Sequence, residues 1–161
     1  RRAILALTLC FAGQGFVAHR VGPDAAKVGQ TRSYWIKTLA PLLKESDVVA
    51  CVDIGWVSAA HSGKVVDLAG VTDPWIAALS GGHTSKALPS TLLSQRGVTR
   101  LLLLIPKGHD AVTAWREGHF ARNVESRLSR QTFTRDNFEL VGEVGTGDFR
   151  YAILTKREVR E

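Results

Sequence analysis

The sequence predicts an α/β fold in which a mixed, mostly parallel sheet with flanking helices and a C-terminal β-hairpin follows an apolar N-terminal helix. Short apolar runs bounded by turn-forming residues alternate with segments of helical composition, as expected of helices packed on a sheet. One run, 98–105, carries five consecutive aliphatic residues, which is typical of a strand buried on both faces. Near the end, two β-rich runs flank Gly145-Thr146-Gly147-Asp148, which predicts the hairpin.

The length and composition predict one globular domain with its own core, because the chain has 161 residues and 45% hydrophobic content. The formal net charge is +6, but basic and acidic residues are interspersed in 116–135 and 156–161. No basic run is interleaved with aromatic residues, so we expect no nucleic-acid partner. The charge indicates a solvated surface or one that faces anionic lipid headgroups. Cys10 and Cys51 lie in different contexts and suggest no disulfide.

The N-terminal region, 1–20, begins with Arg1 and Arg2 and continues as an almost uninterrupted apolar stretch. It is compatible with the end of a transmembrane helix, with a signal peptide, or with a packing helix of a soluble domain. We favour the transmembrane interpretation, because the paired arginines would then lie on the cytoplasmic side and direct the rest outward. Because the chain contains no methionine, we expect it to be a piece of a longer protein.

A linker is predicted over 21–30, where two glycines and a proline interrupt regular structure, and the soluble α/β domain is predicted to cover 31–161. The domain is expected to begin with a helix over 32–45, because apolar side chains recur on one helical face. Pro41 should kink this helix or restart it as a second turn.

Two strands are predicted next, at the apolar runs 47–54 and 64–68, with a turn or short helix around 57–61 between them. Asp73 and Pro74 then predict the start of a helix, with Asp73 as the N-cap and Pro74 as the first helical residue.

The second half of the chain is expected to hold a helix between Pro89 and Gly97 and then the central strand. Residues 111–130 have helical composition, with an interruption at Gly118. The β-rich runs of the predicted hairpin complete the domain, at 138–144 and 149–156.

Three acidic residues mark the ends of apolar runs, and they are the first candidates for a site: Asp53, Asp67 and Asp73. Ligands of open α/β sheets gather beyond the carboxyl ends of the strands, so the three carboxylates could surround a cation or a sugar hydroxyl. The structural alternative, which we favour, is that each side chain binds loop N–H groups or caps a helix.

Other motifs add little chemistry. The histidines lack metal-ligand spacing, and the chain has no Gly-x-Ser-x-Gly elbow, no Rossmann fingerprint and no Walker loop. We therefore expect no cofactor, no metal and no catalytic residue in this chain. Among the four tryptophans, Trp56 directly follows Asp53-Ile54-Gly55, and it is the candidate for stacking on a sugar if it is exposed.

The block around these aspartates also resembles a known family. The resemblance rests on Tyr34-Trp35-Ile36, Val52-Asp53-Ile54-Gly55, the run from Gly63 to Pro74 (Gly-Lys-Val-Val-Asp-Leu-Ala-Gly-Val-Thr-Asp-Pro), the strand 101–105 and the closing hairpin. Together these resemble the C-terminal extracytoplasmic domain of bacterial polytopic membrane glycosyltransferases of the GT-C type. Those enzymes, similar to protein mannosyltransferases and arabinofuranosyltransferases, take sugars from polyprenyl phosphates. The match covers most of 31–155.

The resemblance implies a non-catalytic periplasmic domain on the extracytoplasmic side of the bacterial inner membrane. In that family an early extracytoplasmic loop carries the catalytic carboxylate, and nothing in this chain matches that loop. The expected role is to shape acceptor access or to stabilise the enzyme, with Asp53, Trp56, Asp67 and Asp73 as candidate acceptor contacts. The expected partners are the membrane-embedded remainder of the parent protein, the membrane surface and a glycan acceptor.

Two alternatives remain open from the sequence. One is a free-standing exported α/β enzyme whose site lies at the Asp53 and Asp67 strand ends, and the other is a secreted interaction domain without a small-molecule ligand.

Overall fold

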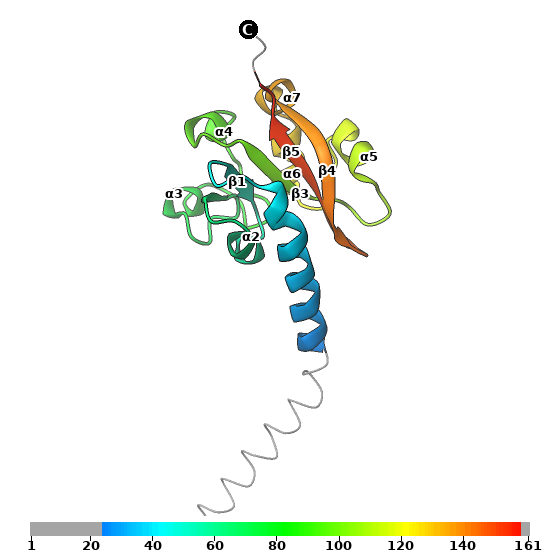
Figure 1. The fold of residues 1–161 in the computed structure, drawn as a ribbon. Coiled ribbons are helices and arrows are strands. Elements are labelled where there is room, and N and C mark those ends of the chain that lie inside the picture. Colours follow the sequence, from blue (N-terminus) through cyan, green and yellow to red (C-terminus); the bar gives the residue numbers. More distant parts are fainter. Residues whose placement is uncertain (1–23, 159–161) are drawn as a thin grey trace, which may run out of the picture. The chain divides into compact units, whose positions relative to one another are not determined.

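The computed structural model describes residues 24–158 (Figure 1). The chain divides into two units, Arg1–Tyr34 and Trp35–Glu161. The predicted apolar helix over 1–20, with its transmembrane interpretation, lies outside the described residues. Within 24–158, no helix is both long enough and apolar enough to cross a bilayer.

Of the first unit, residues 24–34 are described, and they are helical. This corrects the predicted linker over 21–30, because its described part, 24–30, is regular helix. The physical reason is that an isolated glycine such as Gly29 is tolerated within a helix when its neighbours are helix-compatible.

The second unit begins with helical residues 35–39, followed by the 3-10 helix η1 (Ala40–Leu42). Pro41 lies within η1, so the predicted change of helix at this proline is confirmed. A proline cannot donate the backbone hydrogen bond that an α-helix needs at this point, and the chain tightens instead.

The centre of the second unit is a five-stranded sheet with the order β2-β1-β3-β5-β4. Its strands are β1 (Val48–Cys51), β2 (Lys64–Asp67), β3 (Arg100–Leu104), β4 (Phe138–Thr146) and β5 (Phe149–Lys156). β1 pairs in parallel with β2 and β3, whereas β5 is antiparallel to both β3 and β4. Four strands therefore share one direction, and the predicted mixed, mostly parallel sheet with its C-terminal hairpin is confirmed.

Short helices connect the strands (Figure 1). They are α2 (Ile54–Ala60), α3 (Pro74–Ala77), α4 (Leu92–Gln95), α5 (Ala111–Glu117), α6 (Asn123–Arg130) and α7 (Thr132–Asn137). Gly118 separates α5 from α6 as predicted, and its φ of 63° is a left-handed conformation that favours glycine.

The sheet has a hydrophobic core on each face. Ala50, Leu101 and Leu103 contribute to one core, together with buried residues of α3 to α6. Val49 and Leu102 contribute to the other, together with Trp35, Leu39 and Trp56. Neighbouring strand residues belong to different cores because successive side chains point to opposite faces. The central strand β3 is therefore apolar on both faces, which explains the uninterrupted aliphatic run.

The strand order creates a topological switch point. From β1 the chain passes through α2 to β2 on one side, and then through α3 and α4 to β3 on the other side of β1. The carboxyl ends of β1 and β3 therefore lie side by side while their connections diverge. In open α/β sheets this is the place where ligands bind.

Candidate functional site

Asp53 lies at the switch point, two residues after the end of β1. Its Oδ2 atom accepts a hydrogen bond from Arg122 Nη2 at 2.6 Å, and it also accepts one from the Tyr151 hydroxyl. Arg122 directly precedes α6, and Tyr151 belongs to β5, so three distant parts of the sequence meet at one carboxylate oxygen.

Arg122 also binds a second carboxylate, because its Nη1 atom donates to Glu125 Oε1 at 3.0 Å. The same oxygen accepts the backbone N–H of Leu104, the last residue of β3, at 3.2 Å. Glu125 is fully buried, and its Oε2 atom has no hydrogen-bond partner among the described residues. We call Asp53, Arg122, Glu125 and Tyr151 the Arg122 cluster.

Burial raises the pKa of Glu125 to about 7, although the Arg122 guanidinium and the Leu104 N–H oppose this shift. Burial disfavours the charge of Arg122 as well, but the two carboxylates outweigh it and hold the pKa of Arg122 above its ordinary value. Burial and the bond to Asp53 raise the pKa of the Tyr151 phenol. The Arg122 cluster therefore holds one permanent cation, and its Glu125 carboxyl titrates near neutral pH.

The structure places Trp56 in the core beside this cluster. Its side chain is 3% exposed, and its ring centroid lies 5.5 Å from that of Trp35 and 5.2 Å from that of Tyr151. The predicted stacking on a sugar required an exposed indole, and in this conformation Trp56 does not present one. The exposed tryptophan is Trp75, at 48%, and Arg96 Cζ lies 5.8 Å from its ring centroid.

Asp67, the last residue of β2, organises the loop that follows it, 67–72. Oδ1 accepts the N–H groups of Ala69 and Gly70 at 2.9 and 3.0 Å. Oδ2 accepts the N–H of Thr72 at 2.6 Å and its hydroxyl at 3.1 Å. Gly70 has a φ of 73°, and a Cβ atom there would lie 2.6 Å from the backbone nitrogen of Ala77. The Asp67 carboxylate thus holds a loop whose backbone conformation at position 70 requires glycine.

Asp73 caps α3 as predicted, because its side chain accepts the N–H groups of Trp75 and Ile76. Its other carboxylate oxygen, Oδ2, pairs with Arg96 Nη2 at 2.8 Å. Asp53 and Asp67 lie at the carboxyl ends of the parallel strands β1 and β2, but none of the three aspartates shares a hydrogen-bond partner with another. The structural interpretation accounts for Asp67 and Asp73, whereas Asp53 belongs to a partly buried charged cluster.

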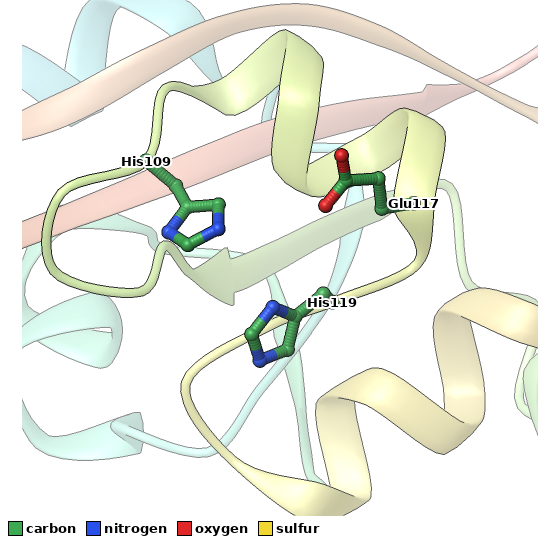
Figure 2. Close-up of side chains that lie close together, drawn as sticks. All are labelled: His109, Glu117 and His119. Atoms are coloured by element: carbon green, nitrogen blue, oxygen red, sulfur yellow. The ribbon is translucent and has the colours of Figure 1, made fainter.

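A second cluster lies after β3, where His109, Glu117 and His119 approach one another (Figure 2). Their nitrogen and carboxylate ligand atoms all lie within 4.8 Å of one another. His109 belongs to the loop before α5, Glu117 is the last residue of α5, and His119 follows Gly118. Among the described residues, this is the group of three suitable side chains whose geometry could hold a metal ion.

Sequence reasoning named Asp53 but missed its partners in the Arg122 cluster, and it missed the second cluster for the same reason. Arg122 binds Asp53, which follows β1, and Glu125 binds the backbone of β3. His109 lies ten positions from His119. Their spacing matches no motif, and only the short helix α5 with its glycine C-cap brings the histidines together. The local signal in the sequence was Gly118 itself, and the structure shows it in the left-handed conformation of a sharp turn.

The fold also has a cavity of about 590 Å³, lined by Glu139, Thr155, Lys156, Arg157 and Glu158. It lies at the opposite end of β5 from Tyr151, because Thr155 pairs with the first residue of β3 and Tyr151 with the last. We do not assign it to the site, since its lining contains none of the clustered residues.

Comparison with known proteins gives a family match. Residues 19–155 match the family described as Domain of unknown function (DUF8728). No curated protein and no solved structure matches the sequence.

Proposed function

This chain belongs to the family of domains of unknown function DUF8728, and we propose that it is the non-catalytic periplasmic domain of a membrane glycosyltransferase that uses polyprenyl-phosphate-linked sugars. Its role in this proposal is to shape acceptor access or to stabilise the enzyme. The proposal rests on the block from Asp53 to Pro74, which resembles that class of domain. In the folded chain this block comprises α2, the outer strand β2 and the loop that leads from β2 to α3.

The engagement of the carboxylates supports a non-catalytic role. Glycosyl transfer needs a carboxylate that can reach the acceptor hydroxyl or the leaving group. Both oxygens of Asp67 bind the loop that follows it, and Asp73 divides its oxygens between α3 and Arg96. Asp53 is held by Arg122 and Tyr151. Each of the three would have to leave a structural partner before it could act on a substrate.

The end of this block, together with residues beyond it, offers a surface suited to a glycan. We call it the Trp75 surface: Val71, Asp73, Trp75 and Arg96. Val71 is 65% exposed and Trp75 is 48% exposed. Arg96 joins the ring of Trp75 to the carboxylate of Asp73. An exposed indole beside a fixed guanidinium provides stacking and hydrogen bonding for a sugar. In the parent enzyme, this surface would contact the acceptor.

The test uses the parent protein in membranes with a polyprenyl-phosphate sugar donor. We expect Trp75→Ala to raise the KM for the acceptor by about 3- to 10-fold, which corresponds to one aromatic contact, and to leave the KM for the donor unchanged. Val112→Ala is the control, because Val112 is also an exposed apolar side chain, at 64%, but lies on α5.

Two outcomes would overturn the proposal. One is sugar transfer by this chain alone, without the rest of the parent protein. The other is a parent gene that encodes no hydrophobic segments before Arg1, together with a product that does not fractionate with membranes.

A second candidate is a free-standing exported α/β enzyme whose site is the Arg122 cluster. The observation in its favour is Glu125, a buried carboxyl with a pKa of about 7 at the switch point between β1 and β3. A small molecule bound there would contact the Tyr151 and Trp56 side chains and change the tryptophan fluorescence. Glu125→Gln would remove the titrating group, and ligand binding that is independent of pH in the wild type would exclude this candidate.

A further inference from the structure

The loop before α5 and the C-terminal end of α5 present two imidazoles and a carboxylate to a common space (Figure 2). We propose that His109, Glu117 and His119 bind one divalent transition-metal ion, with Zn²⁺ as the preferred ion. This site is separate from the Trp75 surface and does not depend on the proposed glycosyltransferase role.

The ligand types select the class of ion. Imidazole nitrogen with one carboxylate oxygen is a donor set that Zn²⁺ accepts, and Co²⁺, Ni²⁺ and Fe²⁺ accept it as well. Ca²⁺ and Mg²⁺ prefer oxygen ligands alone, so two histidines argue against them. Three protein ligands leave at least one coordination position open to water. Glu117 and His119 are exposed, so that position faces solvent.

The backbone at His109 is fixed from both sides. The Arg150 guanidinium, on β5, donates a hydrogen bond to the His109 carbonyl oxygen. The next residue, Asp110, caps α5 by accepting the Thr113 N–H at 2.8 Å. This ligand is therefore carried by a loop tied to the hairpin and to the helix that bears Glu117.

The other two ligands are positioned by the turn at Gly118. The His119 N–H binds the Ala114 carbonyl at 3.0 Å and the Gly118 N–H binds the Trp115 carbonyl at 3.1 Å, a Schellman arrangement. The left-handed Gly118 lets the chain reverse so that Glu117 and His119 both face His109 (Figure 2). A Cβ atom at Gly118 would lie 2.6 Å from Arg130 Cγ, so the turn is specific for glycine.

The side chains need only small adjustments to coordinate an ion. Ligand atoms around a tetrahedral Zn²⁺ lie about 3.3 Å apart, given bonds of about 2.0 to 2.1 Å, and here they are within 4.8 Å. The two imidazole rings already lie 5.3 Å apart between centroids. Glu117 has a 3.8 Å ion pair with the exposed Arg116, and such a pair is weak and easily replaced.

His109 also has a partner of the kind that metal-binding histidines use. Its Nδ1 atom lies 3.4 Å from the Lys107 carbonyl oxygen. In the tautomer with the proton on Nδ1, that nitrogen donates to Lys107 and Nε2 presents its lone pair to the metal. A backbone carbonyl in this position orients the ring and makes it a better ligand.

The experiment treats the full chain with a chelator, removes the chelator, and titrates Zn²⁺ by calorimetry. Thermal unfolding is measured with and without Zn²⁺, and Co²⁺ absorption in the visible range reports the coordination geometry. We expect one ion per chain and a melting temperature that rises with Zn²⁺ concentration. Loss of even a hydrogen-bond partner of a ligand weakens metal binding about 10- to 100-fold, so His109→Ala and His119→Ala should each lose at least as much.

The matched control is His83→Ala, since His83 is also exposed but lies in the loop after α3. Its Zn²⁺ affinity should equal that of the wild type. His119→Gln is the conservative second variant, and an unchanged melting temperature in chelator shows that each variant is folded. Wild-type affinity in the double variant His109→Ala/His119→Ala, or an equal loss in His83→Ala, would overturn the site.

Discussion

The Asp67 loop and the Arg122 cluster each contain a buried carboxylate at the carboxyl edge of the sheet, but the two carboxylates are satisfied to different degrees. Asp67 is 3% exposed and accepts four hydrogen bonds that engage both of its oxygens. Glu125 is fully buried, and only its Oε1 atom has partners among the described residues. Burial therefore does not separate a fully hydrogen-bonded carboxylate from one that is only partly satisfied, whereas the hydrogen-bond partners do.

The partners also differ in their distance along the chain. All hydrogen-bond partners of the Asp67 carboxylate lie within five residues of it, so the loop is a local structure. The Arg122 cluster joins groups 69 and 98 positions apart. Asp67 therefore stabilises one turn, while the Arg122 cluster connects elements that are distant along the chain.

The largest expected effect is that of Arg122→Met. This change leaves Glu125 buried without its cation, so at pH 7 we expect the free energy of unfolding to fall by about 3 to 5 kcal/mol. At pH 5, where Glu125 is protonated, the loss should be smaller. Denaturant unfolding at pH 7 and pH 5 measures the loss of unfolding free energy. An equal loss at both pH values would assign Arg122 a packing role only.

The next effect is the pH dependence that Glu125 imposes. Its pKa in the folded protein is about 7, above the ordinary value of 4.5, so the folded state binds more protons between these values. Stability from this group is therefore complete below about pH 4.5 and is lost as the pH rises through about 7.

Glu125→Gln isolates this contribution, because glutamine stays neutral throughout. Relative to the variant, the wild type should lose up to about 3 kcal/mol of unfolding free energy between pH 4.5 and pH 7.5. Parallel stability curves for the two proteins would show that Glu125 does not titrate in this range.

In the Asp67 loop, Asp67→Ala should lower the free energy of unfolding by about 1 to 3 kcal/mol, because it leaves the N–H groups of the loop without acceptors. Asp148→Ala is the control, since its ion pair with Lys107 is exposed and should contribute little. If Asp67→Ala kept its melting temperature but lost ligand binding, Asp67 would belong to a binding site instead.

The smallest expected effect is that of Asp73→Ala, which should lower the free energy of unfolding by about 1 kcal/mol because α3 loses its N-cap. Asp73→Ser should restore most of it, because serine also accepts the N–H groups of the first turn. Thermal unfolding of the two variants compares them directly. Equal losses would show that the ion pair with Arg96 matters more than the cap.

Local features of the fold were predictable because their causes are close in sequence. The Asp73 cap with Pro74, the hairpin, the helix break at Gly118 and the doubly buried β3 are all confirmed. The predicted linker over 21–30 failed in its described part, 24–30, since an isolated glycine such as Gly29 does not exclude a helix.

The candidate site was less predictable. Asp53 was a candidate from its place after a strand, but its partners Arg122, Glu125 and Tyr151 carried no motif. Trp56 was chosen for its neighbours along the chain, and only packing against Trp35 and Tyr151 shows that it is buried. Sequence position does not reveal which of four tryptophans remains exposed.

By itself, the sequence determined the class of fold, the strands, the caps and the glycine turns, because hydrophobic periodicity and backbone preference act over a few residues. The tertiary structure alone decided which charges meet at the ends of β1 and β3, and which histidines meet beyond α5. Those encounters depend on the strand order and on the directions of side chains from separate elements, and neither is encoded at any single position.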